Sequence, residues 1–453
     1  MAPFLETFHQ TLAIVPVGFN ELIMGFGFGW SAPTLQILTD SNGPKPLTVT
    51  PEQSSWIGSL MDFGRIFGPL ISAVLLDKLG RKLLLGSCTV IFCIAWLMII
   101  LYKEVWAIYT MRLLFGIAMG VNDVSSSIYL AEVSSPKIRG FFCGVTMVAS
   151  YSGELFEFII ATYFSYNAVA IVNAASSFVG VLSTFLLTES PQFLIMKGKL
   201  KKAEKNYLWL KGTNKWDEVN SEFEKIRQNI EEEKVKRESF WKLLSDKANR
   251  QSLIITLILN SLTMTTGFAA ITSFASLAFS SSDILTPNEF TILFGVVQTL
   301  ASFVAMLIID RFNRRTLILA SYALCVLSHI ASAGLYFVHE KITPIEYFPW
   351  FIFVSISLYA AVYALLYPVV HIIRGELFPQ SIKAIGGSVA IMTHACTGFM
   401  TAKMFLQVAE LLGMYANFLF FALISITALF YAYFKLPETR GRTLVDIQKS
   451  MTT

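Results

Sequence analysis

The chain has 453 residues, of which 54% are hydrophobic and only 15% are charged, and its mean hydropathy is +0.59. This composition excludes a soluble globular protein. It indicates an all-α membrane protein with many spanning helices, because the bilayer core forces backbone groups to bond within each segment. The formal net charge of +4 reflects basic residues in loops and does not indicate nucleic-acid binding.

Runs of about 18 to 25 apolar residues are long enough to cross a bilayer. Twelve such runs predict spans at 12–37, 54–76, 83–101, 105–130, 140–164, 167–188, 252–279, 290–309, 316–338, 347–373, 384–409 and 413–434. Basic residues gather in alternate loops, which predicts that both termini are cytoplasmic. We therefore expect a first six-helix bundle at 1–188, a cytoplasmic helical linker at 189–251, a second six-helix bundle at 252–434 and a cytoplasmic tail at 435–453.

The second predicted span ends in a distinctive turn. An apolar run with the small residues Gly64, Gly68 and Ser72 leads into Asp77-Lys78-Leu79-Gly80-Arg81-Lys82. Small residues let helices approach closely in lipid, and the basic residues mark the cytoplasmic surface. A weaker copy, Asp310-Arg311-Phe312-Asn313-Arg314-Arg315, follows the eighth span. Two copies of one signal, half a chain apart, indicate a duplicated membrane protein.

The long polar stretch between the sixth and seventh spans contains one helical pattern. Val219, Phe223, Ile226 and Ile230 recur at helical spacing, with charged residues between them. This periodicity predicts an amphipathic helix that lies on the cytoplasmic face and joins the two bundles. The alternative is a solvated, charged linker.

Charged and glycine-containing motifs recur along the chain. In chain order, they are Arg112-x3-Gly116-x3-Gly120, Tyr129-Leu130-Ala131-Glu132, Pro136-x2-Arg139-Gly140, Glu189-Ser190-Pro191, Gly375-Glu376-Leu377-Phe378-Pro379 and Pro437-Glu438-Thr439-Arg440-Gly441. Two six-span halves joined by a helical linker resemble the major facilitator fold, and these motifs resemble the sugar-porter family. Within that family, Glu376-Leu377-Phe378-Pro379 and Thr401-Ala402-Lys403 resemble the insect facilitated trehalose and glucose transporters.

Opposite charges recur near the cytoplasmic ends of spans in both halves. Because arginine forms bidentate pairs with carboxylates, we predict gating salt bridges that hold the inner side closed and break when the halves rock. The two sets are Asp77, Arg81, Glu132, Arg139 and Glu189, and Asp310, Arg314, Arg315, Glu376 and Glu438. The alternative is that these residues are surface charges that follow the positive-inside rule. Arg65 and Arg112 are expected only to snorkel toward the membrane surface.

The resemblance implies a solute site at mid-membrane, between the halves. The residues expected to face it are Phe28, Met147, Tyr151, Glu154, Thr263, Gln298, Tyr363, His371 and His394. Gln298 keeps an amide that the family uses, whereas Met147, Thr263, His371 and His394 replace family amides or tryptophan. Ser31 stands where proton-coupled members carry an acid, which favours facilitated diffusion.

Glu21, Asp123, Glu154 and Glu157 are carboxylates that fall inside predicted spans. Carboxylates at such depth are costly and suggest function. Glu154 lies seven residues beyond Met147, on the same helix face, and is expected to point at the solute site. A structural role is the alternative. In that case, Glu154 or Asp123 would pair with Lys403, or its carboxyl group would be protonated in the apolar surroundings.

These features favour a sugar uniporter, for trehalose or a hexose, that works by alternating access as a monomer in the cell membrane. Its expected partners are a small solute and membrane lipid, with no cofactor, no metal, no nucleic acid and no enzymatic activity. Two alternatives remain. One is a proton-coupled or organic-cation transporter that uses the intramembrane carboxylates, and the other is a sensor derived from sugar porters that binds solute without moving it.

Overall fold

The computed structural model describes residues 2–39, 47–135, 138–235, 246–279, 282–378 and 380–440. Parts of the predicted linker (236–245) and tail (441–453) lie outside these ranges, as do the motif residues Pro136, Pro379 and Gly441. The described helices include twelve segments that are long and apolar enough to span a membrane, which confirms the predicted number of spans.

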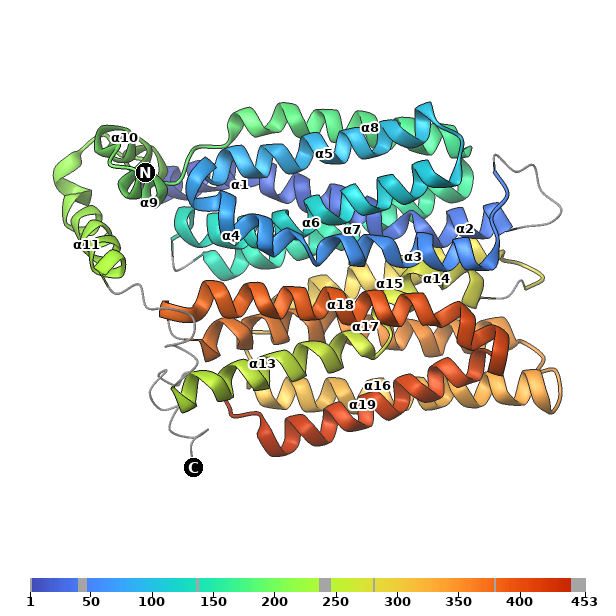
Figure 1. Ribbon diagram of the computed structural model, residues 1–453. Coiled ribbons are helices and arrows are strands. Elements are labelled where there is room, and N and C mark those ends of the chain that lie inside the picture. The colour runs from blue at the N-terminus through green and yellow to red at the C-terminus, as the bar shows by residue number, and fades with distance from the viewer. Residues whose placement is uncertain are drawn as a thin grey trace.

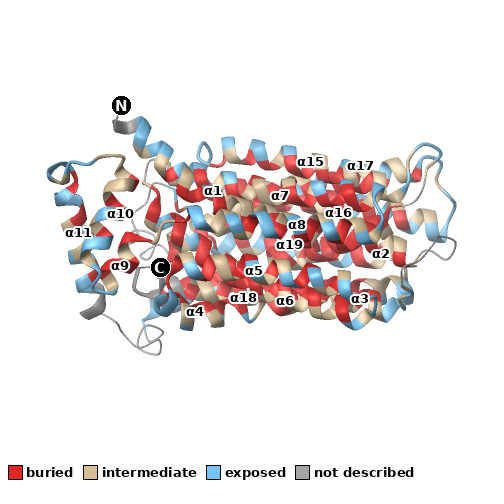
Figure 2. Cartoon of the chain, turned by 90° about the horizontal axis from the view of Figure 1, so that it is seen from above, coloured by how far each residue is buried: buried red, intermediate tan, exposed pale blue. Residues whose placement is uncertain are grey.

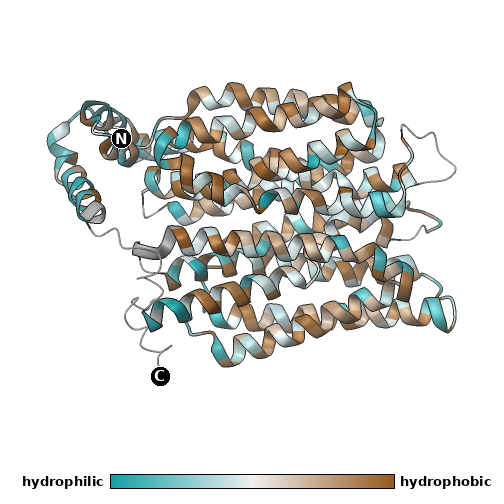
Figure 3. Ribbon diagram, in the orientation of Figure 1, coloured by the Kyte–Doolittle hydropathy of each residue, from teal (hydrophilic) through white to brown (hydrophobic). Residues whose placement is uncertain are grey.

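The first six spans form one bundle and the last six form another, side by side (Figure 1). The first bundle contains α1 (Ala2–Gly29), α2 (Ser31–Thr39), α3 (Pro51–Arg65), α4 (Gly68–Leu79), α5 (Arg81–Leu101), α6 (Val105–Val133), α7 (Arg139–Tyr163), α8 (Tyr166–Ser183) and η1 (Thr184–Leu186). The second contains α13 (Lys247–Thr265), α14 (Phe268–Ala278), α15 (Pro287–Ile308), α16 (Arg314–Lys341), α17 (Phe348–Leu377), α18 (Gln380–Leu412) and α19 (Met414–Lys435). Buried residues fill the interior of both bundles (Figure 2), and apolar residues cover the spanning helices (Figure 3).

Three spans expected to be continuous are interrupted. α1 gives way to α2 at Trp30, α3 gives way to α4 at Ile66 and Phe67, and α13 gives way to α14 at Gly267. Gly267 has φ +108°, and a Cβ there would meet the Phe421 ring at 2.6 Å. Only glycine fits both the left-handed backbone and this close contact. Hydropathy does not reveal such breaks because the apolar pattern continues through them.

The linker is helical where it is described. It forms α9 (Pro191–Met196), α10 (Leu200–Lys211) and α11 (Trp216–Val235), at one end of the bundles (Figure 1). We call this end the linker side. Val219, Phe223 and Ile230 are buried in one apolar cluster, and Ile226 packs against it. The predicted amphipathic helix is therefore confirmed.

The linker also contacts the first helix, which begins at Ala2, about ten residues before the predicted span. The His9 ring stacks on Trp209 at 4.8 Å, and its Nδ1 lies 2.6 Å from the Trp209 carbonyl oxygen. Lys211 pairs with Glu222 at 2.7 Å, and its hydrogen bond lowers the pKa of the Glu222 carboxyl. The polar start of α1 thus belongs to the linker assembly rather than to the span.

Candidate functional site

The two halves meet along two seams, one between α3 and α18 and the other between α7 and α15. On the first seam, the Ser55 hydroxyl donates to the Lys403 carbonyl oxygen at 2.6 Å, and the Phe63 and Phe399 rings lie 5.2 Å apart. On the second, a Cβ at Gly140 would lie 3.7 Å from Asp310, at the linker side. Phe158 and Phe294 pack together toward the opposite end, at 6.4 Å. The halves therefore contact each other near both ends of the bundles.

Between the seams, α17 carries a column of rings at every fourth residue. The Tyr359 and Tyr363 rings are 5.8 Å apart, those of Tyr363 and Tyr367 are 5.9 Å apart, and Tyr367 meets His371 edge-on at 4.3 Å. His394 of α18 lies 5.2 Å from Tyr367. Residues four apart share one face of a helix, so these rings form a continuous wall.

Buried polar groups with unused hydrogen-bonding capacity lie near this wall. Gln298 of α15 is 1% exposed, and its amide makes no hydrogen bond of standard geometry in the described part of the chain, although the Tyr151 side chain lies close enough to interact with it. One carboxyl oxygen of Glu154 on α7 also has no hydrogen-bond partner there. Tyr151, one turn before Glu154, lies close enough to the Gln298 side chain for a hydrogen bond and is also near Tyr367. Unsatisfied buried polar groups are costly and rare, so this cluster suits a ligand that supplies hydroxyls.

Other expected site residues are engaged elsewhere. The Thr263 hydroxyl lies 2.6 Å from that of Tyr322, inside the second half. Phe28 and Met147 are half-buried, and neither makes a hydrogen bond among the described residues. Glu157 accepts a hydrogen bond from Asn173 at 2.9 Å within the first half. We therefore retain Tyr151, Glu154, Gln298, Tyr363, His371 and His394 as candidates.

The structure excludes one open alternative, the pairing of Asp123 with Lys403, and contradicts the expectation that Arg65 and Arg112 snorkel. Asp123 pairs with Arg65 rather than with Lys403, at 2.7 Å, and Arg65 is only 4% exposed. Lys403 instead places its ammonium 4.1 Å from the centre of the Trp56 ring. Arg112 does not snorkel either, because it is 1% exposed. Because neighbouring helices surround these side chains, their charged groups do not extend to the membrane surface.

Glu21 is also paired within the first half. It accepts hydrogen bonds from Asn122 at 3.0 Å and from Ser126 at 3.2 Å. Asn122 in turn accepts from Asn20, so this carboxylate belongs to a network between α1 and α6. Structural pairing accounts for the burial of Glu21. Glu157 bonds to Asn173 but, like Glu154, keeps one carboxyl oxygen without a partner among the described residues.

On the linker side, the first half contains a charge cluster centred on Arg81. Its guanidinium contacts Glu132 at 2.8 Å and Asp77 at 3.4 Å. Glu189 accepts hydrogen bonds from the backbone amides of Arg81 and Lys82, so it caps the start of α5. A Cβ at Gly80, where φ is +95°, would lie 2.4 Å from the Glu189 carboxylate. The glycine of the predicted turn is thus required for this approach.

The second half repeats this arrangement. Arg314 contacts Asp310 at 2.9 Å and Glu376 at 3.8 Å. Glu438 accepts from the backbone amides of Arg314 and Arg315, both at 3.1 Å, and so caps α16. Both clusters link helices within one half, at the ends where we expected them.

Arg139 and Arg315 do not fit the expected ion pairs. Arg139 donates to the carbonyl oxygens of Ala131 and Ser134, and Arg315 donates to that of Tyr433, with no carboxylate partner for either side chain in the described ranges. Their position beside helix C-termini explains this, because the last carbonyls of a helix lack partners within it.

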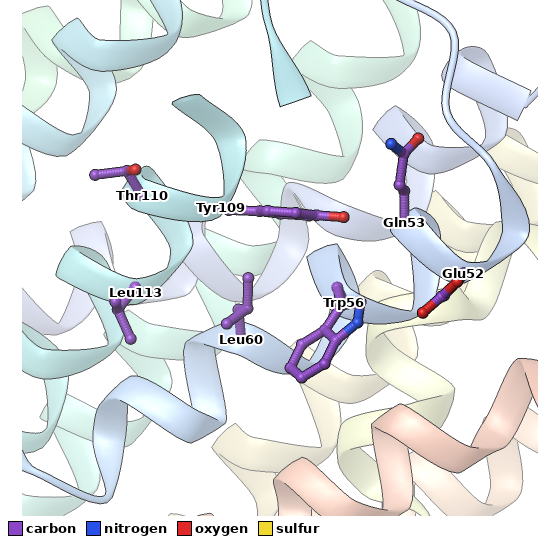
Figure 4. A pocket seen from close by; sticks show the side chains of 7 residues that line it. All are labelled: Glu52, Gln53, Trp56, Leu60, Tyr109, Thr110 and Leu113. Atoms are coloured by element: carbon purple, nitrogen blue, oxygen red, sulfur yellow. The ribbon is translucent and has the colours of Figure 1, made fainter. Parts of the chain in front are cut away.

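A pocket of about 500 Å³ lies between α3 and α6 (Figure 4). It is lined by Glu52, Gln53, Trp56, Leu60, Tyr109, Thr110 and Leu113. None of the expected solute-binding residues lines it. The candidate solute site therefore rests on the buried polar groups at the seams rather than on this pocket.

Comparison with known proteins identifies the family. Residues 14–450 match the sequence profile of the family described as "Sugar (and other) transporter". The chain therefore belongs to this family of transporters. It is similar to proteins described as "Facilitated trehalose transporter Tret1" from Apis mellifera ligustica, at 28% identity over 97% of this chain and 88% of that protein, and from Aedes aegypti, at 27% identity over 98% of this chain. The chain spans only 55% of the length of the Aedes protein.

The fold is that of the major facilitator transporters. The chain superposes on the xylose transporter XylE from E. coli, in a partially occluded inward-open conformation, with a TM-score of 0.78. The match covers 96% of this chain and all of that chain, at 17% identity. XylE bound to 6-bromo-6-deoxy-D-glucose superposes with a TM-score of 0.76, at 16% identity over 98% of this chain and 99% of that chain. At these identities, the likeness supports the fold alone.

Proposed function

We propose that this protein is a facilitated transporter of a sugar, trehalose or a hexose, and that it works by alternating access. The observation that carries the proposal is a pair of buried polar groups whose hydrogen-bonding capacity is largely unused, the Gln298 amide and the Glu154 carboxyl, near the ring column of α17. An amide both donates and accepts, and aromatic faces suit sugar rings, so together they match a neutral polyol. The family and the trehalose-transporting relatives support the same solute class.

The linker side is proposed to face the cytoplasm, in the cell membrane. The basic loops lie at this end, in agreement with the positive-inside rule. The Arg81 and Arg314 clusters would then stabilise each half at its cytoplasmic end while the halves rock about the site.

Uptake of radiolabelled glucose and trehalose into proteoliposomes, with and without a pH gradient, tests this function. We expect saturable uptake that does not depend on the gradient. Gln298→Leu keeps the side-chain size and removes both hydrogen-bonding atoms, so uptake should fall about tenfold or more. Gln407→Leu alters an exposed amide on α18 and serves as the control. Equal uptake by the two variants would contradict the proposed site.

A proton-coupled carrier is the second candidate, because Glu154 is buried with an unpartnered oxygen. It predicts accumulation driven by the pH gradient and abolished by Glu154→Gln. A sensor would instead show sugar-dependent thermal stabilisation without any flux.

A further inference from the structure

A polar contact between the two halves lies one helical turn beyond Tyr363, on the linker side. Arg65 belongs to the first half and Tyr367 to the second, and the Arg65 Nη2 lies 3.5 Å from the Tyr367 hydroxyl. This distance is at the limit of a hydrogen bond, so the contact is weak and easily exchanged.

The guanidinium of Arg65 is held firmly within the first half. Its Nε donates to Asp123 of α6 at 2.7 Å. Arg65 is the last residue of α3, and the chain touches the α6 backbone on either side of it: a Cβ at Gly64 of α3 would lie 2.4 Å from the Leu113 carbonyl oxygen, and one at Gly68, the first residue of α4, would lie 2.2 Å from Gly120. Because α3 cannot shift relative to α6, Asp123 fixes the direction in which Arg65 points.

Tyr367 has different neighbours and moves with the second half. Its ring contacts His371 and His394, and Pro368 follows it in α17. If the halves separate on the linker side, the Arg65–Tyr367 contact must break, whereas the Arg65–Asp123 pair stays intact. Tyr367 therefore contributes a contact that closes the linker side, whereas the Arg65–Asp123 pair holds Arg65 in place whether that side is closed or open.

We propose that Arg65, oriented by Asp123, binds the solute directly, and that a vicinal diol of the sugar displaces the Tyr367 hydroxyl from it. A guanidinium has five N–H donors; one is used by Asp123, and Nη1 makes no hydrogen bond within the described ranges. The two terminal nitrogens can donate in parallel to neighbouring hydroxyls. Solute binding then removes a contact that closes the linker side, which couples binding to opening. This inference rests on the proposed function.

The pairing with Asp123 also indicates the charge of the solute. Asp123 neutralises Arg65, so a neutral polyol adds no uncompensated charge. Arg374, whose Nη2 lies 2.9 Å from His371 Nδ1, is the nearby cation that would favour an acidic sugar instead. Glucuronate therefore serves as the competing ligand in the test.

The proposed closing role of Tyr367 is tested by spin labels at Phe141, near the linker-side start of α7, and at Phe312, in the turn that follows α15; both side chains are exposed. The exposed Cys143 and Cys396 and the half-buried Cys93 are replaced by serine. Without sugar, Tyr367→Phe should shift the distance distribution toward longer values, because the closing hydroxyl is lost. Tyr322→Phe removes a buried hydroxyl that bonds only within the second half, and should leave the distribution unchanged. Identical distance distributions for the two variants would overturn the proposal that the Tyr367 hydroxyl helps to close the linker side.

Binding is tested by isothermal titration with trehalose, glucose and glucuronate. Arg65→Lys and Asp123→Asn should each weaken sugar binding by about tenfold or more, with Arg227→Lys in the linker as the control. Unchanged affinity in both variants, or tighter binding of glucuronate than of the neutral sugars, would overturn the assignment of Arg65 to a neutral diol. If the unmodified protein neither binds nor transports any of these sugars, the proposed function fails. The spin-label distances measured without sugar still test whether Tyr367 helps to close the linker side.

Discussion

Arg112 shows how a single residue can hold three helices together. It lies on α6 and is 1% exposed. Its Nε donates to the carbonyl oxygen of Ile57 on α3 at 2.9 Å, and its Nη1 donates to that of Gly27 on α1 at 2.6 Å. A rigid, forked guanidinium can span two carbonyls on different helices, which a single ammonium cannot do in the same geometry.

We therefore expect Arg112→Lys to lower the free energy of unfolding by about 2 kcal/mol, since a buried carbonyl loses a charged donor. Thermal melting of the purified protein in one fixed lipid and detergent mixture measures this change. Arg227→Lys, at a partly exposed linker position, should leave the melting temperature unchanged. The same small shift in both variants would show that the two carbonyl contacts contribute little.

At the scale of elements, close contact between α1 and α7 depends on glycines. A Cβ at Gly153 would lie 2.0 Å from the Leu22 carbonyl oxygen, and one at Gly25 would lie 2.1 Å from that of Ser150. No side chain fits at these separations, so the helices pack backbone to backbone. This is the form of association that small residues permit in a bilayer.

Gly153→Ala should force α1 and α7 apart and lower the free energy of unfolding by about 1–3 kcal/mol. Gly334→Ala is the matched control, because a Cβ at Gly334 in α16 meets nothing within 4 Å. It should be neutral or slightly stabilising, since alanine favours a helix over glycine. Melting curves of the two variants decide the matter, and equal destabilisation would refute the packing argument.

At the scale of the whole molecule, the two halves share one arrangement, in which a glutamate caps a helix next to an arginine cluster. Glu189 caps α5 and Glu438 caps α16, each beside an arginine bound to carboxylates of its own half. An anion at a helix N-terminus is favourable because unpaired amides point at it. The described residues of the two clusters share no partner, so each half is stabilised separately at its linker-side end.

This separation predicts additive effects. Glu189→Ala and Glu438→Ala should each cost about 1 kcal/mol, as the loss of a helix cap does, and the double variant should lose the sum of the two within about 0.5 kcal/mol. Denaturation of the single and double variants measures the three values. A large deviation from the sum would mean that the clusters interact across the halves.

Much of the architecture was predictable because its causes are local. Twelve apolar runs, the Gly80 turn and the spacing of Val219, Phe223 and Ile230 each act over a few helical turns, and each appears in the structure as expected. The breaks at Trp30 and Gly267 were not predicted, because they arise from contacts with other helices that leave the hydropathy unchanged. The spacing of Tyr359, Tyr363, Tyr367 and His371 on one face of α17 was visible in the sequence as a period of four, and could have identified the ring column.

By itself, the sequence determined the number of spans, the duplication of the halves and the linker helix, because hydropathy and helical periodicity depend on neighbours along the chain. Only the tertiary structure decided which buried charges meet. Arg65 and Asp123 are separated by 58 residues, and Arg65 and Tyr367 by 302. Such pairs form through the packing of whole helices against each other, and no pattern within one span specifies the partner that another span brings.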